Sequence, residues 1–445
     1  MSTPIWAKQQ GTAIDDTIMD FLAADDIELD RQLIHYDIVA SKAHVAGLRA
    51  IEILSESESL QLITQLDQLT HDLASGQFKI CDEFEDGHSA IEFYLTNRLG
   101  DLGKKIHTGR SRNDQVLVAT RLYLKEGLSN ALKYTEKAAR ICLSQAERMK
   151  NTPMPGYTHL QRAVPSSVGL WFAGFAEAMI DNLITLDAAY QLIDANPLGT
   201  AAGYGVNLPL ERELTTKTLE FARLQINPIY AQNSRGKFEL AVLSALSQSL
   251  LDIRRFCWDL SLFTSQEFDF IRLPDEMTTG SSIMPNKRNP DLIEMMRGSY
   301  AIVQAAIVEL QSLVSLPSGY HRDLQLTKAP MMRAVGNGLK NLRLFAAIVG
   351  NIDFNTDKLD AAIDTPMFAT DLAIELSATG QPFRDAYRQV VERYEELETR
   401  TAQQSIESRV SPGACAALML DALQVRLDTL CAKLPSKNNS AQYTE

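Results

Sequence analysis

Residues 116–149 read VLVATRLYLKEGLSNALKYTEKAARICLSQAERM, a segment that contains no proline and a single interior glycine, Gly127. Because nothing in it breaks a helix, the segment predicts one continuous helix about 50 Å long. Residues 165–194 are the next long segment of this kind and predict a second helix, with Pro165 in its first turn. Long uninterrupted helices are typical of a helical bundle.

Two further segments repeat their apolar positions at steps of three and four, the spacing that aligns side chains along one face of a helix. The positions are Leu243, Leu246, Leu250, Ile253, Cys257 and Leu260 in the first segment, and Leu292, Met296, Ser299, Val303, Ala306, Leu310 and Leu313 in the second. We predict an all-α protein of three helical domains: 1–109, a central long-helix bundle at 110–355, and 356–445. Such bundles often bury a further face against other subunits, so we expect a homo-oligomer.

Composition excludes several function classes. The chain has 445 residues and a formal net charge of -13, which argues against non-specific binding of nucleic acid. No segment approaches the ~20 consecutive apolar residues that cross a bilayer, and the first residues lack the basic-then-apolar pattern of a signal peptide. The five cysteines are odd in number and scattered. We therefore expect a cytoplasmic protein without nucleic-acid or membrane partners.

Three segments interrupt the helical pattern with polar residues, glycine and proline. The first is IHTGRSRNDQ at 106–115. Residues 102–113 hold Lys104, Lys105, Arg110 and Arg112 and no acid, which is typical of a carboxylate-binding surface. A solvated loop before a helix that starts at Asn113 or Asp114 explains the composition equally well.

The second segment is PGYTHLQ at 155–161. It places His159 in a turn flanked by hydrogen-bonding residues, where an imidazole could donate or accept a proton. A structural histidine is the more frequent case, and this segment alone does not distinguish the two. We interpret His35, His44 and His71 as structural because they lie in helical stretches.

The third segment is GSSIMPNKRNPD at 280–291. Pro274 and Gly280 delimit an expected mobile lid, and Asn289 with Pro290 resembles the cap and first position of the helix that carries Glu294. The glycine before two serines lets the backbone approach an anion closely. Lys287 and the helix N-terminus supply positive potential at the same place, so the segment favours anion binding. Taken alone, Glu294 is better explained as a first-turn residue favoured by the helix dipole.

Metal and nucleotide motifs are weak. His88 and Glu92 are four residues apart, as helical metal ligands can be, but no further histidine or cysteine accompanies them. No GxxxxGK[ST] loop is present. We expect no metal.

The third segment is similar to GSSxMPxKxNP, the signature of the fumarase/aspartase superfamily, whose members remove a proton beside a carboxylate and release fumarate. The runs SRNDQ at 111–115, PGYTHLQ at 155–161 and YHRDLQ at 320–325 with Lys328 resemble the argininosuccinate lyase family. The likeness continues through NPLG at 196–199 and PFRDA at 382–386. It therefore spans nearly the whole chain.

The resemblance implies a β-elimination of argininosuccinate to L-arginine and fumarate, in arginine biosynthesis and without a cofactor. It implies Ser281 as the general base, Lys287 and Asn289 as groups that meet the negative charge, and His159 with Glu294 as the protonating pair. The implied substrate-binding residues are His88, Ser111, Arg112, Asn113, Thr158, Gln161, Ser282, Tyr320, Gln325 and Lys328. It also implies a homotetramer whose sites are built from three chains.

The chain departs from the family pattern in several places. The family's WGGRF appears only as residues 6–10, WAKQQ, and an Asn-Asp-Ser-like stretch is replaced by ADD at 24–26. The run EDGH at 85–88 has a glycine where the family usually has an aliphatic residue. Lys287-Arg288 replaces a Lys-Lys pair and is also common in adenylosuccinate lyases. Adenylosuccinate lyase, fumarase, aspartase and a non-catalytic helical scaffold therefore stay as alternatives.

The long helix has a consequence for any shared site. If 116–149 is continuous, the first and second segments lie at its opposite ends, about 50 Å apart. They cannot meet within one chain. A site that uses both segments requires at least two subunits.

Overall fold

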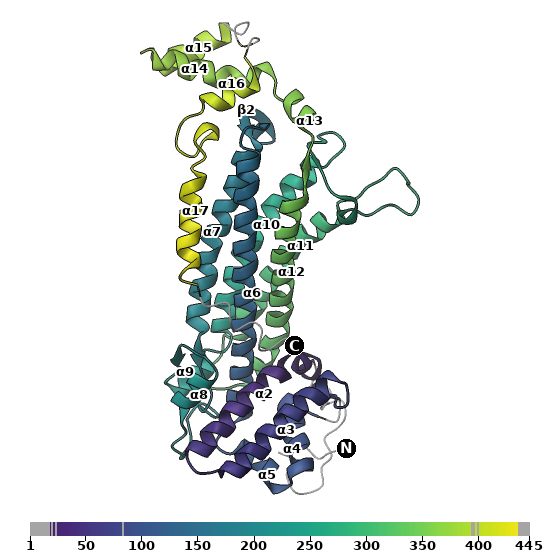
Figure 1. The fold of residues 1–445 in the computed structure, drawn as a ribbon, viewed down its shortest axis with the longest axis vertical. Coiled ribbons are helices and arrows are strands. Elements are labelled where there is room, and N and C mark those ends of the chain that lie inside the picture. The colour runs from purple at the N-terminus through teal and green to yellow at the C-terminus, as the bar shows by residue number, and fades with distance from the viewer. Residues whose placement is uncertain are drawn as a thin grey trace.

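The computed structural model describes residues 18, 21–22, 25–81, 84–392, 397 and 400–434. Residues 6–10 and Ala24, where departures from the family pattern were noted, lie outside this part. Figure 1 shows an elongated molecule, with a long helical bundle between a group of shorter helices at each end. Among the helices of the described part, none combines the length and apolar character needed to span a bilayer.

Five long helices form the bundle: α6 (Arg112–Arg148), α7 (Val168–Ile193), α10 (Lys237–Phe263), α11 (Asp291–Leu313) and α12 (Lys328–Asn351). The prediction of one helix over 116–149 is confirmed, since α6 runs unbroken for 37 residues. All six predicted seam positions of α10 are buried. On α11, Met296, Val303, Ala306 and Leu310 are buried as predicted, whereas Leu292, Ser299 and Leu313 are only half-buried and Ile293 is buried instead of Leu292. The all-α prediction is confirmed.

The N-terminal helices are α2 (Asp26–Ala50), α3 (Glu56–Ala74), α4 (Gly87–Leu99) and α5 (Asp101–Lys104). They enclose their own apolar cluster, which includes Leu48, Leu62 and Ile91. Helix α2 also contributes Leu33 and Ala40 to the core of the bundle. This double packing fixes the N-terminal helices against the first turns of α6.

The remaining helices are short. They are α8 (Arg212–Thr218) and α9 (Pro228–Asn233) near the N-terminal helices, and α13 (Thr356–Ala361), α14 (Ala369–Ala378), α15 (Phe383–Glu392), α16 (Ala402–Ser408) and α17 (Leu420–Cys431). Helices α13 to α16 lie at the far end of the bundle, whereas α17 returns along α6 and α7 (Figure 1). The division at 109/110 and 355/356 stays a prediction.

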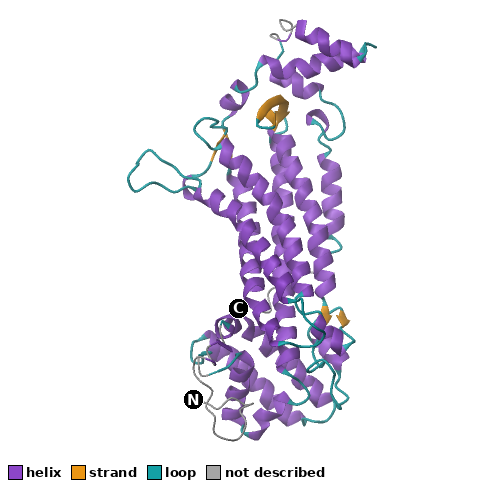
Figure 2. Cartoon of the chain, turned by 180° about the vertical axis from the view of Figure 1, so that it is seen from behind, coloured by secondary structure: helices purple, strands orange, loops and turns teal. Residues whose placement is uncertain are grey.

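In the part of the chain that the structure describes, strands occur as three two-stranded pieces (Figure 2). They are the antiparallel pair β1 (Pro153–Thr158) and β2 (Gln161–Ser167), the parallel pair β3 (Ala195–Asn196) and β4 (Arg223–Leu224), and the antiparallel pair β5 (Ile271–Arg272) and β6 (Asp353–Phe354). The prediction that Pro165 opens a helix is wrong. Pro165 lies in β2 opposite Pro155, because a two-stranded hairpin has free edges that tolerate residues without an N–H. Helix α7 begins three residues later, and the Ser167 hydroxyl accepts a hydrogen bond from Leu170 N at its start.

Gly169 allows the close contact that orients this hairpin on the end of α6. A Cβ on Gly169 would lie 2.5 Å from Lys150 Cα and 2.7 Å from Ala146 O. We predict that Gly169→Ala lowers the free energy of unfolding by about 1–3 kcal/mol, because backbone atoms must move. Gly174→Ala, on the same helix with no atom within 4 Å of the added carbon, is the control and should be neutral or up to about 1 kcal/mol stabilising. Urea denaturation of both variants checks this; equal effects would contradict it.

Candidate active site

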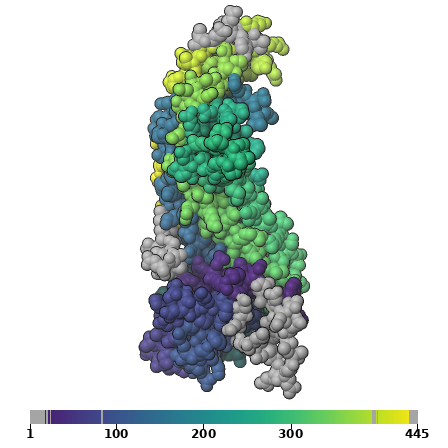
Figure 3. Space-filling view, turned by 90° about the vertical axis from the view of Figure 1, so that its right-hand side faces the viewer, coloured from purple at the N-terminus to yellow at the C-terminus, as the bar shows by residue number. Residues whose placement is uncertain are grey.

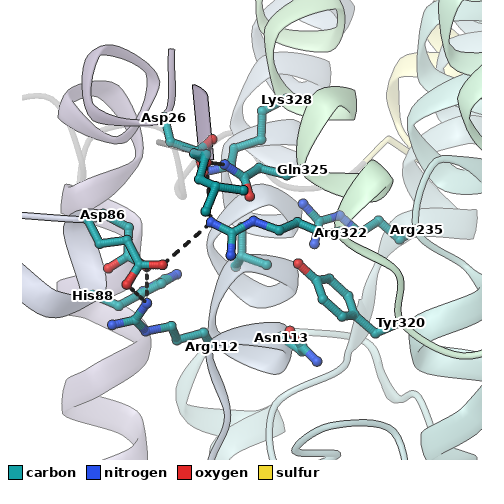
Figure 4. Close-up of a pocket in the computed structure, with 13 residues that line it drawn as sticks. Asp26, Asp86, His88, Arg112, Asn113, Arg235, Tyr320, Arg322, Gln325 and Lys328 are labelled. Carbon is teal, nitrogen blue, oxygen red and sulfur yellow. Dashed lines mark hydrogen bonds and ion pairs between the residues drawn. The ribbon is translucent and has the colours of Figure 1, made fainter. Parts of the chain in front are cut away.

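A pocket of about 410 Å³ opens where α2, α4 and the start of α6 meet the segment before α12 (Figure 4). It is lined by Leu22, Asp26, Glu85, Asp86, His88, Arg112, Asn113, Val116, Arg235, Tyr320, Arg322, Gln325 and Lys328. Six residues proposed from sequence as substrate-binding are among them: His88, Arg112, Asn113, Tyr320, Gln325 and Lys328. Segments more than 200 residues apart in the chain therefore share one pocket.

The N-terminus of α6 presents Arg112 and Asn113 to this pocket. The helix begins at Arg112, earlier than predicted, because Ser111 is its N-cap and forms a capping box with Asp114. Asp114 is fully buried and also accepts hydrogen bonds from the N–H groups of Gly199 and Ala201, both at 2.9 Å. The NPLG run at 196–199 thus anchors the helix start. Ser111 caps the helix and does not line the pocket.

Arg112 is held by two acids from the segment before α4. Its Nη1 lies 2.6 Å from Glu85 Oε2 and 3.2 Å from Asp86 Oδ2. Burial disfavours the charged guanidinium, but the neighbouring carboxylates outweigh burial and raise the pKa of Arg112. The cation-rich sequence at 102–113 is therefore partly neutralised in three dimensions, which composition did not reveal.

Lys328 is also paired. Its Nζ lies 2.8 Å from Asp30 Oδ1 and 2.9 Å from Asp26 Oδ1, and the residue is 4% exposed. Burial raises the pKa of Asp26, although Lys328 opposes this effect. Gln325 Nε2 donates to Leu22 O at 2.9 Å. Lys328 therefore places Asp26 at the pocket wall, and most of its own charge is already compensated.

His88 belongs to a buried ion pair. Its Nδ1 lies 2.5 Å from Asp37 Oδ2 on α2. Burial opposes protonation of the imidazole, but the Asp37 carboxylate outweighs burial and raises the pKa of His88 above its ordinary value. Gly87 N, at the start of α4, donates to Asp30 Oδ2 at 2.8 Å. The start of α4 is therefore bonded to the carboxylate that also pairs with Lys328.

The second predicted segment forms a tight hairpin turn at the other end of α6. Thr158 pairs with Gln161, and the two turn residues, His159 and Leu160, have positive φ values of 56° and 58°. Of the two common two-residue hairpin turns, type I′ needs positive φ at both positions, which usually favours glycine, asparagine or aspartate. Non-glycine residues in this conformation store strain and are frequent at functional sites. The predicted turn is confirmed, with the His159 side chain exposed to solvent.

The third segment projects from the bundle as a loop (Figures 1 and 2), and Figure 3 views the molecule from the side on which it projects. Thr279 and Asn289 close its neck, with Thr279 N donating to Asn289 O at 3.0 Å and Asn289 N donating to Thr279 O at 2.8 Å. We call residues 279–290 the lid. Inside it, Ser281 Oγ accepts hydrogen bonds from Met284 N at 3.2 Å and Ile283 N at 3.4 Å.

The lid differs from the sequence prediction at its C-terminal side. Helix α11 begins at Asp291 with Pro290 as its N-cap, and no side chain caps it. Asn289 does not cap the helix because its backbone is committed to Thr279 and its side chain donates to Gly280 O at 3.5 Å. Glu294 lies exposed in the first turn of α11 and forms no hydrogen bond with His159 of the same chain.

The predicted site residues therefore fall into three places within one chain. The pocket and the hairpin that holds Thr158, His159 and Gln161 lie at opposite ends of α6, about 55 Å apart at its helical rise. Ser281, Ser282, Lys287 and Asn289 lie on the projecting lid. Sequence reasoning did not identify Arg235, Arg322 or the acids Asp26, Glu85 and Asp86 as pocket-lining residues. The runs YHRDLQ, ADD and EDGH contain Arg322 and the three acids and could have indicated them, whereas Arg235 lies in none of the quoted runs.

Metal ligands are not grouped in the described part of the chain. No three histidine, cysteine, aspartate or glutamate side chains there could hold an ion together. His88 bonds to Asp37 and lines the pocket, and Glu92 does not join it there.

Comparison with known proteins gives a consistent result. A family model described as Lyase matches residues 15–305. Argininosuccinate lyase of Stenotrophomonas maltophilia (strain R551-3) is 54% identical over 431 residues, 97% of this chain and 100% of the relative. Argininosuccinate lyase of Xanthomonas euvesicatoria pv. vesicatoria (strain 85-10) is 55% identical over 433 residues, with the same coverage. The chain belongs to the argininosuccinate lyase family.

Solved structures share the family's fold. An EDDS lyase in complex with formate has a TM-score of 0.79 at 22% identity and covers 95% of this chain and 92% of its own. A class II fumarase from Schistosoma mansoni has a TM-score of 0.71 at 16% identity and covers 95% and 93%. At these identities the likeness shows the fold, and the family assignment rests on the sequence relatives.

The Asp37–His88 pair predicts a pH-dependent stability. Because the pKa of His88 is raised in the folded state, the stabilisation is fully present below the ordinary pKa of 6.5 and is lost as pH rises through the raised value. We predict that Asp37→Asn lowers the pKa of His88 and costs about 3–5 kcal/mol at pH 5.5, and less at pH 8. NMR titration of the imidazole and urea unfolding at both pH values check this.

Asp67→Asn is the matched control, because Asp67 pairs with Lys42 on the surface and is 61% exposed. It should change stability by less than about 1 kcal/mol at either pH. An unchanged titration of His88 in Asp37→Asn would contradict the prediction.

Proposed function

We propose that the protein is an argininosuccinate lyase, a carbon–nitrogen lyase of arginine biosynthesis that cleaves argininosuccinate to L-arginine and fumarate. The observation that carries this proposal is the 54–55% identity to argininosuccinate lyases over 97% of this chain and the full length of those relatives. The reaction requires no redox step, so the proposal includes no cofactor.

The pocket suits the arginine half of the substrate. That half carries a cationic guanidinium, an ammonium and a carboxylate, and the pocket wall carries the acids Asp26, Glu85 and Asp86 beside several cations. Tyr320, Gln325 and Asn113 add neutral hydrogen-bonding groups. A site lined by both signs of charge favours such a substrate over a purely anionic one such as fumarate.

The lid supplies the chemistry. Removing a proton from the carbon beside a carboxylate puts a second negative charge on that carboxylate, which fixed donors must stabilise. In our proposal Ser281 takes the proton, and Lys287, Asn289 and Ser282 meet the developing charge. The hydrogen bonds from Met284 N and Ile283 N to Ser281 Oγ favour its alkoxide form.

The electron pair of the broken C–H bond forms the double bond of fumarate, and the bond between carbon and the guanidine nitrogen breaks. In our proposal His159, oriented by Glu294, protonates the departing nitrogen of arginine. Thr158 and Gln161 flank it on the same hairpin and bind the substrate. The solvent-exposed hairpin is free to enter a neighbouring subunit's site.

We further propose a homotetramer in which each site combines segments of three chains. The length of α6 supports this, because it separates the pocket from the hairpin within one chain. We also propose a reducing cytoplasmic location, since all five cysteines are free and disulfides are rare in such compartments.

The activity is tested with purified protein and argininosuccinate by following fumarate absorbance. We predict fumarate release by the wild type and a loss of several orders of magnitude in kcat for Ser281→Ala, on the order of 10³-fold or more. Size-exclusion chromatography should show an unchanged oligomer, because Ser281 lies on the projecting lid. Fumarate release from adenylosuccinate or aspartate, but not from argininosuccinate, would overturn the assignment.

Sharing of the site is tested by mixing two inactive variants, His159→Asn and Ser281→Ala. After co-refolding, sites that take the hairpin from one chain and the lid from another should recover up to about a quarter of wild-type activity, the statistical share of intact combinations. Mixing the two intact oligomers without refolding is the control and should recover none. No recovery in co-refolded, correctly assembled protein would mean that both segments come from the same chain.

A further inference from the structure

Arg235 is a buried cation of the pocket that neither the sequence motifs nor the mechanism above uses. It is 6% exposed and lies between α9 and α10. Its backbone is fixed, since Arg235 N donates to Gln232 O at 3.1 Å and Gly236 follows with a φ of 81°. A Cβ on Gly236 would lie 2.0 Å from Val314 Cγ1. The fold therefore holds Arg235 at the pocket by a turn that only glycine fits.

The other cations of the pocket are already engaged. Arg112 is paired with Glu85 and Asp86, Lys328 is paired with Asp26 and Asp30, and Arg322 donates to Leu22 O at 3.2 Å. For Arg235 the structure gives no hydrogen bond and no ion pair of its side chain within the described residues. Its guanidinium lies over the ring of Tyr320, 5.9 Å from the centroid, and points into the pocket (Figure 4).

A buried guanidinium without a partner is costly, because it has lost its hydration and gained little in return. Burial accordingly lowers the pKa of Arg235. Such a group is kept in a pocket most readily when a ligand anion completes its hydrogen bonds. The planar guanidinium has parallel N–H donors that can bind both oxygens of a carboxylate at once.

Three acids lie in the field of Arg235, namely Glu239, Asp26 and Asp30, and of these only Asp26 lines the pocket. Arg235 and Asp26 interact electrostatically, yet they are not within ion-pair distance, because Asp26 is drawn to Lys328. The pocket thus presents an unpaired cation and, near it, a carboxylate. An α-amino acid group carries its carboxylate and ammonium on one carbon and fits between such charges.

We propose that Arg235 binds the α-carboxylate of the arginine half of the substrate, with Asp26 receiving the adjacent ammonium. This makes Arg235 a specificity-determining residue that selects an amino acid over an amine. The inference rests on the proposed function for the identity of the substrate. The two carboxylates of the succinyl half do not bind Arg235 in this proposal, because that half must reach Ser281 and Lys287 on the lid.

The test uses two probes that differ only in this carboxylate, L-arginine and agmatine, its decarboxylated analogue. Calorimetry gives the dissociation constant of each probe for the intact oligomer of the wild type and of Arg235→Met. We expect Arg235→Met to weaken L-arginine binding by about 10- to 100-fold, the range of a charge-assisted hydrogen bond, and to change agmatine binding by less than about threefold.

Two further variants sharpen the result. Arg254→Met removes another guanidinium that lies over a tyrosine ring, that of Tyr300, outside the pocket, and should change neither probe's affinity. Asp26→Asn should weaken both probes, because both keep the ammonium. Equal weakening of L-arginine and agmatine by Arg235→Met, or no weakening of either, would overturn the proposal.

Turnover separates this inference from the proposed function. If the wild type releases fumarate from argininosuccinate, Arg235→Met should raise KM by about 10-fold or more and lower kcat much less, since it removes binding shared by ground and transition states. An inactive wild type that still binds L-arginine through Arg235 would refute the proposed function and leave the carboxylate site standing.

Discussion

The rigid length of α6 is the constraint on which the rest of the structure depends. An α-helix of 37 residues cannot bend back on itself, so the groups at its two ends stay about 55 Å apart. At one end it presents Arg112 and Asn113 to a charged pocket, and at the other it carries the hairpin with His159. The bundle around α6 keeps the pocket and the hairpin of one chain at this fixed distance. The pocket of one chain can therefore meet a hairpin only from another chain, in an oligomer.

The start of α6 shows how much buried polar structure is needed to position a few pocket residues. The Asp114 carboxylate accepts three backbone hydrogen bonds, from Ser111, Gly199 and Ala201. These bonds fix the first turn of the helix and the loop at 196–201 together. Since a buried carboxylate without such donors is strongly destabilising, this network favours one orientation of the turn that carries Arg112.

Charge in the pocket is arranged in pairs, and this arrangement determines which groups remain free for a ligand. Arg112 and Lys328 are each shared between two carboxylates, whereas no carboxylate of the described residues lies within ion-pair distance of Arg235. Counting charges along the sequence would assign equal roles to all of them. The difference arises from which acids the fold places beside each cation.

The sequence by itself determined the helical architecture, the unbroken helix over 116–149 and the segments that carry His159, Ser281 and Lys328. Helical periodicity and turn chemistry are local properties, so they can be read from neighbouring residues. It placed Pro165 and Asn289 wrongly, because hairpin pairing and the neck of the lid depend on the partners that each strand finds. Only the tertiary structure brought Arg235, Tyr320 and Asp26 together, since their proximity results from the packing of distant segments, which no local pattern records.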